Sequence, residues 1–148
     1  MAFNRGQIVC LVAALFGGAA MTCHAALAVG ALAVGVPAGG VVKGYAIGFS
    51  LNAKTEDDAH QAAVAACKKT TGSNAAAMAQ CAVVTTFRNQ CASSAMDPAN
   101  GTPGAGWGVG GTQKAADEQA LERCRETAGA DRRGFCKVLD HHCDGTAK

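Results

Sequence analysis

Three sets of residues in this sequence have types and spacings that could support chemistry. Gly106, Gly108 and Gly111 spell G-x-G-x-x-G directly before a helix-like segment, which is the outline of a dinucleotide-binding turn. The segment Asp140–Asp144 reads DHHCD and is the densest group of potential metal ligands. The chain also has 8 cysteines among 148 residues, and cysteines act as nucleophiles, metal ligands or disulfide partners. The elements that position these residues decide between the possibilities.

The second half of the sequence repeats the first, and this repeat bears on the glycine motif. Gly44–Gly48 (GYAIG) matches Gly106–Gly110 (GWGVG) at an offset of 62, and the same offset carries Ala33-Val34 onto Ala95-Met96. A duplication explains this self-similarity, with the offset shrinking in the loops between elements. The next two elements match at offsets of 57 and 55: Ala59, Ala63 and Cys67 with Ala116, Ala120 and Cys124, then Cys81–Val83 with Cys136–Val138.

Under this alignment the glycine motif does not predict a nucleotide site. The second and third glycines of the motif correspond to Ala46 and Phe49 in the first copy, so the phosphate-contacting glycines are not repeated. Both copies keep instead an outer glycine and an aromatic residue, Tyr45 or Trp107. We therefore expect no cofactor, and we interpret the glycines as positions where a short strand packs closely against a helix.

The N-terminus predicts export. Arg5 is followed by the apolar run Ile8–Ala20 and then by small residues that lead to Ala25. This order is typical of a secretory signal peptide that is cleaved after a small residue. We expect a signal peptide over residues 1–25 and a single domain over residues 26–148, located in the periplasm or secreted.

Two alternatives to a cleaved signal peptide are weaker. A lipoprotein signal would use Cys23, but no large aliphatic residue stands three positions before it. An uncleaved anchor would extend through Val42, but Gly30, Gly35 and Pro37 interrupt the apolar run. We therefore expect no membrane contact after cleavage. The net charge of +2 also gives no clustered basic face for nucleic acid.

Each copy is predicted to form a hairpin, a helix and a strand. Turn residues separate the strands, and Thr55 and Thr112 are suited to N-cap the helices. The result is an α+β fold with an internal ββαβ duplication, its half-repeats covering about 30–87 and 91–143, in which two helices cover one face of a mostly antiparallel sheet. The predicted elements are strands 31–34, 42–50, 81–87, 91–96, 106–110 and 136–143, and helices from Thr55 to Gly72 and from Thr112 to Ala128.

Six cysteines remain after signal cleavage, and an oxidising compartment favours disulfides between them. In each copy the helix ends near one cysteine and another cysteine begins the following strand, so a bond there would hold the helix to the sheet. Their spacings contain no C-x-x-C pair, which makes a zinc site the weaker interpretation. Six cysteines allow 15 pairings, and the repeat favours Cys67–Cys81, Cys124–Cys136 and Cys91–Cys143, the last connecting the two copies.

These motifs resemble an uncharacterised family of small exported bacterial proteins, domain-of-unknown-function family 4189. The resemblance rests on the strand Gly30–Val34, on Gly106-Trp107-Gly108, on the two Ala-x3-Ala-x3-Cys helices and on the strand Cys81–Phe87. It covers nearly the whole exported chain and implies paired half-repeats and export. The sequence departs from the family in Tyr45, where tryptophan is usual, and in its Asp-His-His segment. The family brings no catalytic motif that can be transferred to this chain.

The remaining candidates for chemistry are weak. Neighbouring residues on a strand point to opposite faces, so His141 and His142 are poorly placed to share a metal ion, and Cys143 is expected to be oxidised. No serine lies in a G-x-S-x-G turn, and the disulfides would consume the thiols. We predict no catalytic residues and no metal site, so the protein is not expected to be an enzyme.

The leading functional hypothesis is a small exported binding protein that recognises another protein as a monomer. Phe87, Arg88 and Trp107 are the candidate binding residues, because aromatic residues and arginine dominate protein interfaces. For Trp107 the repeat equivalence with Tyr45 favours a packed structural residue, and it is a binding candidate if it is exposed. A concrete version is an immunity or inhibitor protein that acts in the periplasm against a toxin or a cell-wall hydrolase. The alternatives are a secreted effector or minor envelope-acting enzyme, and a stress-related structural protein.

Overall fold

The computed structural model describes residues 28–148, and the predicted signal peptide lies outside them. Two half-repeats follow one another along the chain. The first contains β1 (Val29–Gly35), a 3-10 turn (Val41–Lys43), β2 (Ala46–Ala53), α1 (Glu56–Cys67), α2 (Ala75–Ala79) and β3 (Ala82–Phe87). The second contains β4 (Cys91–Met96), β5 (Ala105–Gly110), α3 (Gln113–Thr127), a 3-10 turn (Arg133–Phe135) and β6 (Lys137–Cys143).

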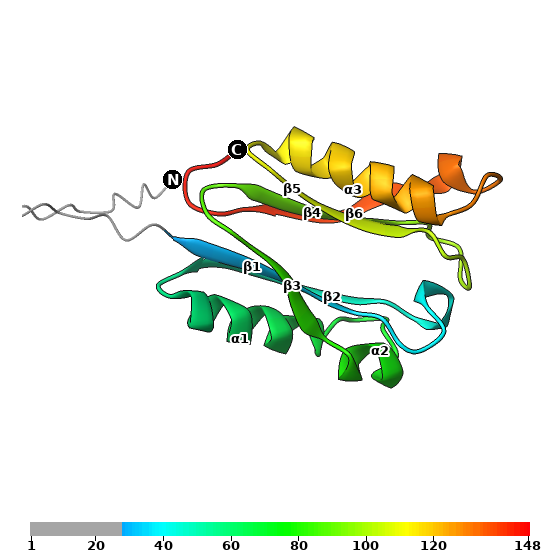
Figure 1. Cartoon of the computed structure of the whole chain (residues 1–148), viewed down its shortest axis with the longest axis horizontal. Coiled ribbons are helices and arrows are strands. Elements are labelled where there is room, and N and C mark those ends of the chain that lie inside the picture. The colour runs from blue at the N-terminus through cyan, green and yellow to red at the C-terminus, as the bar shows by residue number, and fades with distance from the viewer. Residues whose placement is uncertain (1–27) are drawn as a thin grey trace, which may run out of the picture.

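The strands form two antiparallel sheets, with strand orders β2-β1-β3 and β5-β4-β6. The sheets face each other, while α1 and α2 cover the outer face of one and α3 covers the outer face of the other (Figure 1). The predicted α+β class and the ββαβ duplication are confirmed. The single sheet of the prediction is replaced by two, since both faces of each sheet are apolar and each sheet therefore needs a helix on one side and a second sheet on the other.

Glycine and alanine let each helix lie almost directly on its sheet. A Cβ added to Gly48 would stand 2.5 Å from the backbone oxygen of Ala63, and one added to Gly106 would stand 2.5 Å from the backbone nitrogen of Cys124. Ala63 and Cys124 are themselves completely buried. Gly106 and Gly108, two of the three glycines that resembled a nucleotide motif, therefore serve helix–strand packing, because only a residue without a side chain fits at this separation.

The larger apolar side chains lie between the two sheets. Leu32 and Phe87 are buried there with Ala92, and half-buried residues from β1, β2 and β5 pack around them. The half-buried set comprises Val34, Ile47, Phe49, Leu51, Trp107 and Val109. The two half-repeats thus share one apolar layer, in which Phe49 also contacts the His142 ring at a centroid distance of 4.9 Å.

The structure corrects the alignment of the two glycine-rich strands. Gly48 and Gly106 occupy the same place against the helix, and Thr70 and Thr127 make the same pair of bonds to Ile47 and Ala105. The offset between β2 and β5 is therefore 58 (48 to 106), not 62. Trp107 consequently corresponds to Phe49, and the predicted equivalence of Trp107 with Tyr45 is wrong. A run of alternating glycines matches almost equally well at either offset, which is why the sequence alone misled.

Local differences from the predicted elements have local causes. The residues predicted to begin the second strand form a 3-10 turn, so that β2 begins at Ala46 rather than at Val42. Helix α1 ends at Cys67 rather than at Gly72. The disulfide from Cys67 fixes this end of the helix to the neighbouring strand. The additional helix α2 is N-capped by Asn74, whose side chain accepts a hydrogen bond from Ala77 N–H.

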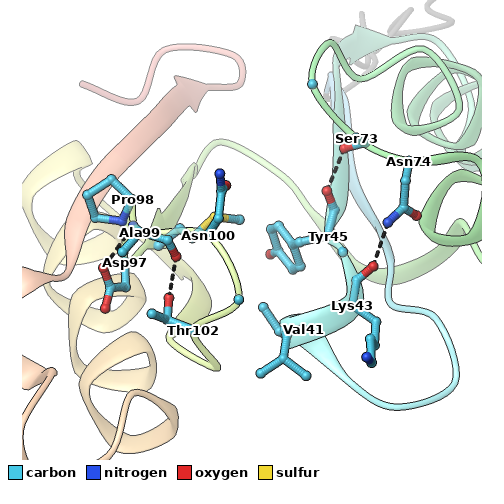
Figure 2. Close-up of a pocket in the computed structure, with 15 residues that line it drawn as sticks. Val41, Lys43, Tyr45, Ser73, Asn74, Asp97, Pro98, Ala99, Asn100 and Thr102 are labelled. Atoms are coloured by element: carbon cyan, nitrogen blue, oxygen red, sulfur yellow. Dashed lines mark hydrogen bonds between the residues drawn. The ribbon is translucent and has the colours of Figure 1, made fainter.

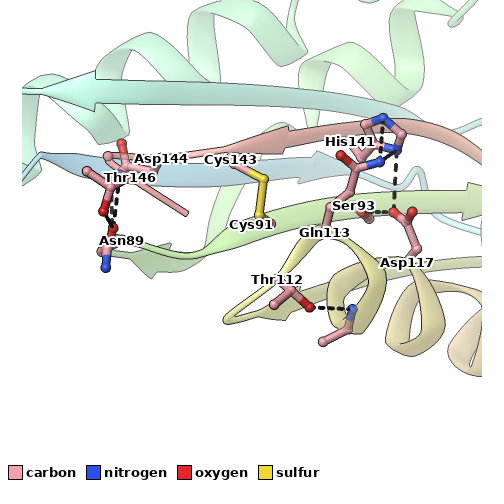
Figure 3. Close-up of a disulfide and its surroundings, with 12 residues drawn as sticks. Asn89, Cys91, Ser93, Thr112, Gln113, Asp117, His141, Cys143, Asp144 and Thr146 are labelled. Carbon is pink, nitrogen blue, oxygen red and sulfur yellow. Dashed lines mark hydrogen bonds and ion pairs between the residues drawn. A yellow bond between two sulfur atoms is a disulfide. The ribbon is translucent and has the colours of Figure 1, made fainter. Parts of the chain in front are cut away.

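The three predicted disulfides, Cys67–Cys81, Cys124–Cys136 and Cys91–Cys143, are present. The first two join a helix to the start of the following strand in each half-repeat, as expected. The third joins facing residues on the neighbouring strands β4 and β6, within the second half-repeat (Figure 3). The expectation that it connects the two copies is therefore wrong. A set of three disulfides is typical of proteins that fold in an oxidising compartment.

A buried carboxylate joins the two halves instead. Asp144 is completely buried, and its carboxylate accepts hydrogen bonds from Asn52 N–H (2.6 Å) and Asn89 N–H (3.4 Å). The two asparagine side chains in turn accept hydrogen bonds from the backbone N–H groups of Gly145 and Thr146. The segment after β6 is thereby held between the end of β2 and the turn before β4, and Figure 3 shows the part made by Asn89.

We predict that Gly106→Ala destabilises the protein by about 1–3 kcal/mol, because the new methyl group pushes α3 away from β5. Gly111→Ala is the matched control, since a Cβ there meets no atom within 4 Å. Chemical denaturation of the oxidised protein measures both. Equal unfolding free energies for the two variants would contradict the close-packing interpretation.

Candidate functional site

A pocket of about 310 Å³ lies at one end of the molecule, between the β1–β2 loop of the first half-repeat and the β4–β5 loop of the second. Figure 2 shows the two loops facing each other across it. Tyr45 and Lys43 come from the first loop, and Asn100 and Thr102 come from the second. Because the two half-repeats supply opposite walls, the pocket exists only when they are packed together.

Tyr45 is the distinctive residue of the pocket. Its ring points from the start of β2 toward the opposite loop (Figure 2), and only 9% of the residue is exposed. Its hydroxyl is shielded from solvent and has no hydrogen-bond partner among residues 28–148. Burial raises the pKa of this hydroxyl well above its usual range, so the side chain is a neutral phenol that can both donate and accept.

The first wall is fixed by the loop that precedes α2. Ser73 Oγ donates to the backbone carbonyl of Tyr45, and Asn74 Nδ2 donates to the backbone carbonyl of Lys43 (Figure 2). Asn74 also caps α2. These bonds hold the backbone on both sides of Gly44, whose positive φ of 140° suits glycine. The position of Tyr45 is therefore determined before any ligand binds.

The second wall is fixed by an ion pair. Asp97 is 1% exposed, and Arg132 donates a hydrogen bond of 2.7 Å to each of its carboxylate oxygens. Asp97 also accepts from Ala99 N–H, while Thr102 Oγ1 donates to the Ala99 carbonyl. The bidentate hydrogen bond from Arg132 holds the pKa of Asp97 below its usual range, with the bond from Ala99 and the charge of Arg132 acting in the same direction.

The pocket is suited to binding by hydrogen bonds. The Asp97 charge is neutralised by Arg132, which leaves the exposed Lys43 as the unpaired charge among the described lining residues. Ser73 is already engaged with a backbone carbonyl, and the described lining residues include neither histidine nor cysteine. The walls therefore offer a neutral phenol, amide and hydroxyl groups and one cation, without an assembled nucleophile and base.

A second polar cluster lies under α3. Asp117 accepts a hydrogen bond from the buried Ser93 hydroxyl, and the His141 ring lies 3.5 Å from the same carboxylate oxygen (Figure 3). Serine, aspartate and histidine are the residues of a hydrolytic triad, but here the aspartate stands between the other two. The histidine therefore does not contact the hydroxyl that it would have to deprotonate. This cluster holds α3 to the edge strand β6.

The structure places the three sequence-predicted binding residues in different settings. Phe87 is only 2% exposed and lies in the layer between the sheets, so it is a core residue rather than a surface contact. Trp107 packs against that same layer, beneath the Arg123 guanidinium at 4.3 Å from its ring centre. Arg88 is exposed and pairs with Glu56 at 3.0 Å. Phe87 and Trp107 thus belong to one cluster, but that cluster is internal.

The neighbouring histidines of β6 point to opposite faces, as predicted. His141 contacts Gln113 and Asp117 on α3, whereas His142 contacts Phe49 of the other sheet. In residues 28–148 no group of three potential ligands is assembled around a common point. Within the same part of the chain, every helix is too short or too polar to cross a bilayer.

Tyr45 is not among the site residues predicted from the sequence, because the assumed alignment made it the counterpart of Trp107. With the correct offset of 58, its counterpart is Pro103, and the second half-repeat has no equivalent tyrosine. A tyrosine present in one copy alone, beside a turn that includes Gly39, Gly40 and Gly44, was the available signal. It becomes visible only when the strands are aligned through their contacts with the helices.

Comparison with protein families agrees with this architecture. The family model described as domain of unknown function DUF4189 matches residues 29–143, from the first residue of β1 to the last residue of β6. The chain belongs to the DUF4189 family. It matches no curated protein and no solved structure. The match covers both half-repeats and says nothing about the role of the pocket.

In this DUF4189 domain we predict that acidification removes the stabilisation that the Asp97–Arg132 pair gives to the second wall of the pocket. Since the folded pKa of Asp97 lies below its unfolded value of about 3.9, the pair with Arg132 stabilises the fold above that pH, and the contribution is lost as the pH falls through the folded pKa. Denaturation of wild type and Asp97→Asn between neutral and acidic pH measures this loss. We expect the difference in unfolding free energy between wild type and Asp97→Asn to shrink on acidification. A difference that stays constant with pH would contradict the prediction.

Proposed function

We propose that this protein is an exported binding protein that recognises another protein with the end of the molecule formed by its two hairpin loops. Its place of action is the periplasm or the medium, as the predicted signal peptide and the disulfides suggest. The observation that carries the proposal is the unpartnered hydroxyl of Tyr45 beside the pocket.

A buried hydroxyl without a partner costs about 1–3 kcal/mol of folding free energy. Phenylalanine would fill the same space without this cost, so stability alone gives no reason for a tyrosine here. A partner group that hydrogen-bonds to the hydroxyl would recover the loss in the complex. Because the hydroxyl is shielded in the free protein, this contact requires a small movement of the loop between Asp97 and Gly104.

The size and charge of the pocket favour a protein as the partner. Its volume of about 310 Å³ lies at the lower limit of small-molecule sites and suits one or two inserted side chains. The rims are loops on a rigid, disulfide-linked scaffold, which limits the entropy lost on binding. Lys43 at the rim favours an acidic surface on the partner. An inhibitor or immunity protein directed at a toxin or cell-wall hydrolase is one form of this proposal.

We predict that Tyr45→Phe leaves the unfolding free energy unchanged or raises it by about 1 kcal/mol, while it weakens partner binding. Ser73→Ala is the control, because it removes a hydroxyl that has a partner and should lower stability by about 0.5–1.5 kcal/mol. Denaturation curves compare the two variants. A clear loss of stability in Tyr45→Phe would show that the hydroxyl is bonded in the free protein.

Site-specific photo-crosslinking locates the binding end. A photoreactive amino acid at Asn100, on the pocket wall, is expected to label a partner in an extract of the exporting compartment, and Tyr45→Phe is expected to reduce that labelling. The same amino acid at Gln61, on the exposed face of α1, is the control. Labelling from Arg88 but not from Asn100 would move the interface to the opposite end and contradict the proposal.

A further inference from the structure

The middle of the β4–β5 loop carries an asparagine followed by a glycine, Asn100-Gly101, on the wall of the pocket. This is the pair in which asparagine loses its side-chain amide most readily. Glycine has no side chain to hinder the attack of its backbone nitrogen, and its backbone rotates more freely than that of other residues. Both residues are exposed and lie in a turn outside strands β4 and β5.

The groups that would react are free of hydrogen bonds. In the part of the chain that the structure describes, neither the side-chain amide of Asn100 nor the N–H of Gly101 has a hydrogen-bond partner (Figure 2). The neighbouring residues Ala99 and Thr102 bond to each other instead. A Cβ built on Gly101, whose φ is 75°, would meet no atom within 4 Å. The turn therefore has room for the rotation that brings the Gly101 nitrogen to the Asn100 side chain.

The other asparagines among residues 28–148 are held in place. Asn52 and Asn89 accept hydrogen bonds from backbone N–H groups of the segment after Asp144. The amide of Asn74 donates to a backbone carbonyl of the opposite loop and also caps α2. Each of these three is followed by alanine or glutamine rather than by glycine. Sequence and structure therefore single out Asn100.

We propose that Asn100-Gly101 is a site of self-modification, at which Asn100 becomes aspartate and isoaspartate in the folded protein. The Gly101 nitrogen gives its proton to a base in the solvent and attacks Cγ of Asn100. A new C–N bond closes a cyclic imide, and the side-chain nitrogen takes a proton and leaves as ammonia. Water then opens the ring. Cleavage of the bond between Cγ and nitrogen gives aspartate, and cleavage of the bond between the main-chain carbonyl and nitrogen gives isoaspartate.

The products change the charge of the pocket wall. A carboxylate replaces a neutral amide on the loop that faces Lys43, which carries the unpaired charge among the described lining residues (Figure 2). Isoaspartate also lengthens the backbone of the loop by one atom. The new carboxylate offsets the charge of Lys43, so a pocket that favours an acidic partner loses this preference as the protein ages. This consequence for binding rests on the function proposed above, whereas the modification itself does not.

Peptide mass spectrometry of the folded, oxidised protein tests the proposal. During incubation in mildly alkaline buffer, the peptide that contains Asn100 should gain the mass by which a hydroxyl group exceeds an amide NH2 group, and chromatography should separate an aspartate and an isoaspartate form. Peptides that contain Asn52, Asn74 or Asn89 should keep their amides. Digestion at mildly acidic pH prevents conversion during preparation.

Two variants control for the mechanism. Gly101→Ala should slow the conversion by at least about tenfold, which corresponds to about 1.4 kcal/mol in the barrier. Asn100→Gln retains an amide but would have to close a larger ring, so its peptide should stay unchanged. Circular dichroism confirms that both variants fold.

Conversion at Asn100 no faster than at Asn74 would overturn the proposal. So would equal rates in wild type and Gly101→Ala, or aspartate without isoaspartate, because direct hydrolysis of the amide makes no isoaspartate. None of these measurements needs a partner, so they can fail while the binding function stands.

The effect on binding is measured separately with a photoreactive amino acid at Val42, which also lines the pocket. Asn100→Asp, which imitates the aspartate product, should label a partner less than Asn100→Gln does. Equal labelling by the two variants would overturn the charge effect. Absence of labelling with either variant would count against the binding function, and the modification is decided by the mass measurements alone.

Discussion

The close approach of helix to sheet is the constraint on which the rest of the structure depends. Gly48 and Gly106 bring the helix backbone so near to the strand that no side chain fits between them. The helix accordingly places only small residues over the strand, as at Ala63 and Ala120. Such an interface buries little apolar area per residue, so disulfides at the helix ends and a second apolar layer between the sheets supply the remaining stability.

The same close approach explains which helices and disulfides could be predicted from the sequence. The Ala-x3-Ala-x3-Cys spacing puts three buried residues on one helix face, and this predicted both long helices and two of the disulfides. The Cys91–Cys143 pair was predicted because these were the two cysteines left over. Its position within one half-repeat was not predicted. The second sheet was missed because Leu32 and Ala33 are both apolar, and an apolar run does not show which neighbour covers each face.

The pocket was not predictable from the sequence for a different reason. Its walls come from two loops far apart in the chain, and loop geometry depends on bonds such as those from Ser73 and Arg132. The aromatic residues noticed first, Phe87 and Trp107, belong to the core, whereas Tyr45 was assigned a false counterpart. The two halves share a backbone plan but differ at their loops. These differences, rather than the shared motifs, carry the specific properties of the molecule.

The hydrogen bonds around the buried Asp144 have a consequence for the order in which the chain reaches its final structure. The end of β2 is synthesised early, yet the backbone N–H of Asn52 obtains its carboxylate partner only when Asp144 arrives after β6. Asn52 and Asn89 both hold left-handed backbone angles, with φ of 54° and 50°, and the hydrogen bonds from Gly145 and Thr146 to their side chains secure these conformations. The half that is synthesised first therefore obtains its last hydrogen-bond partner only when the end of the chain has been made.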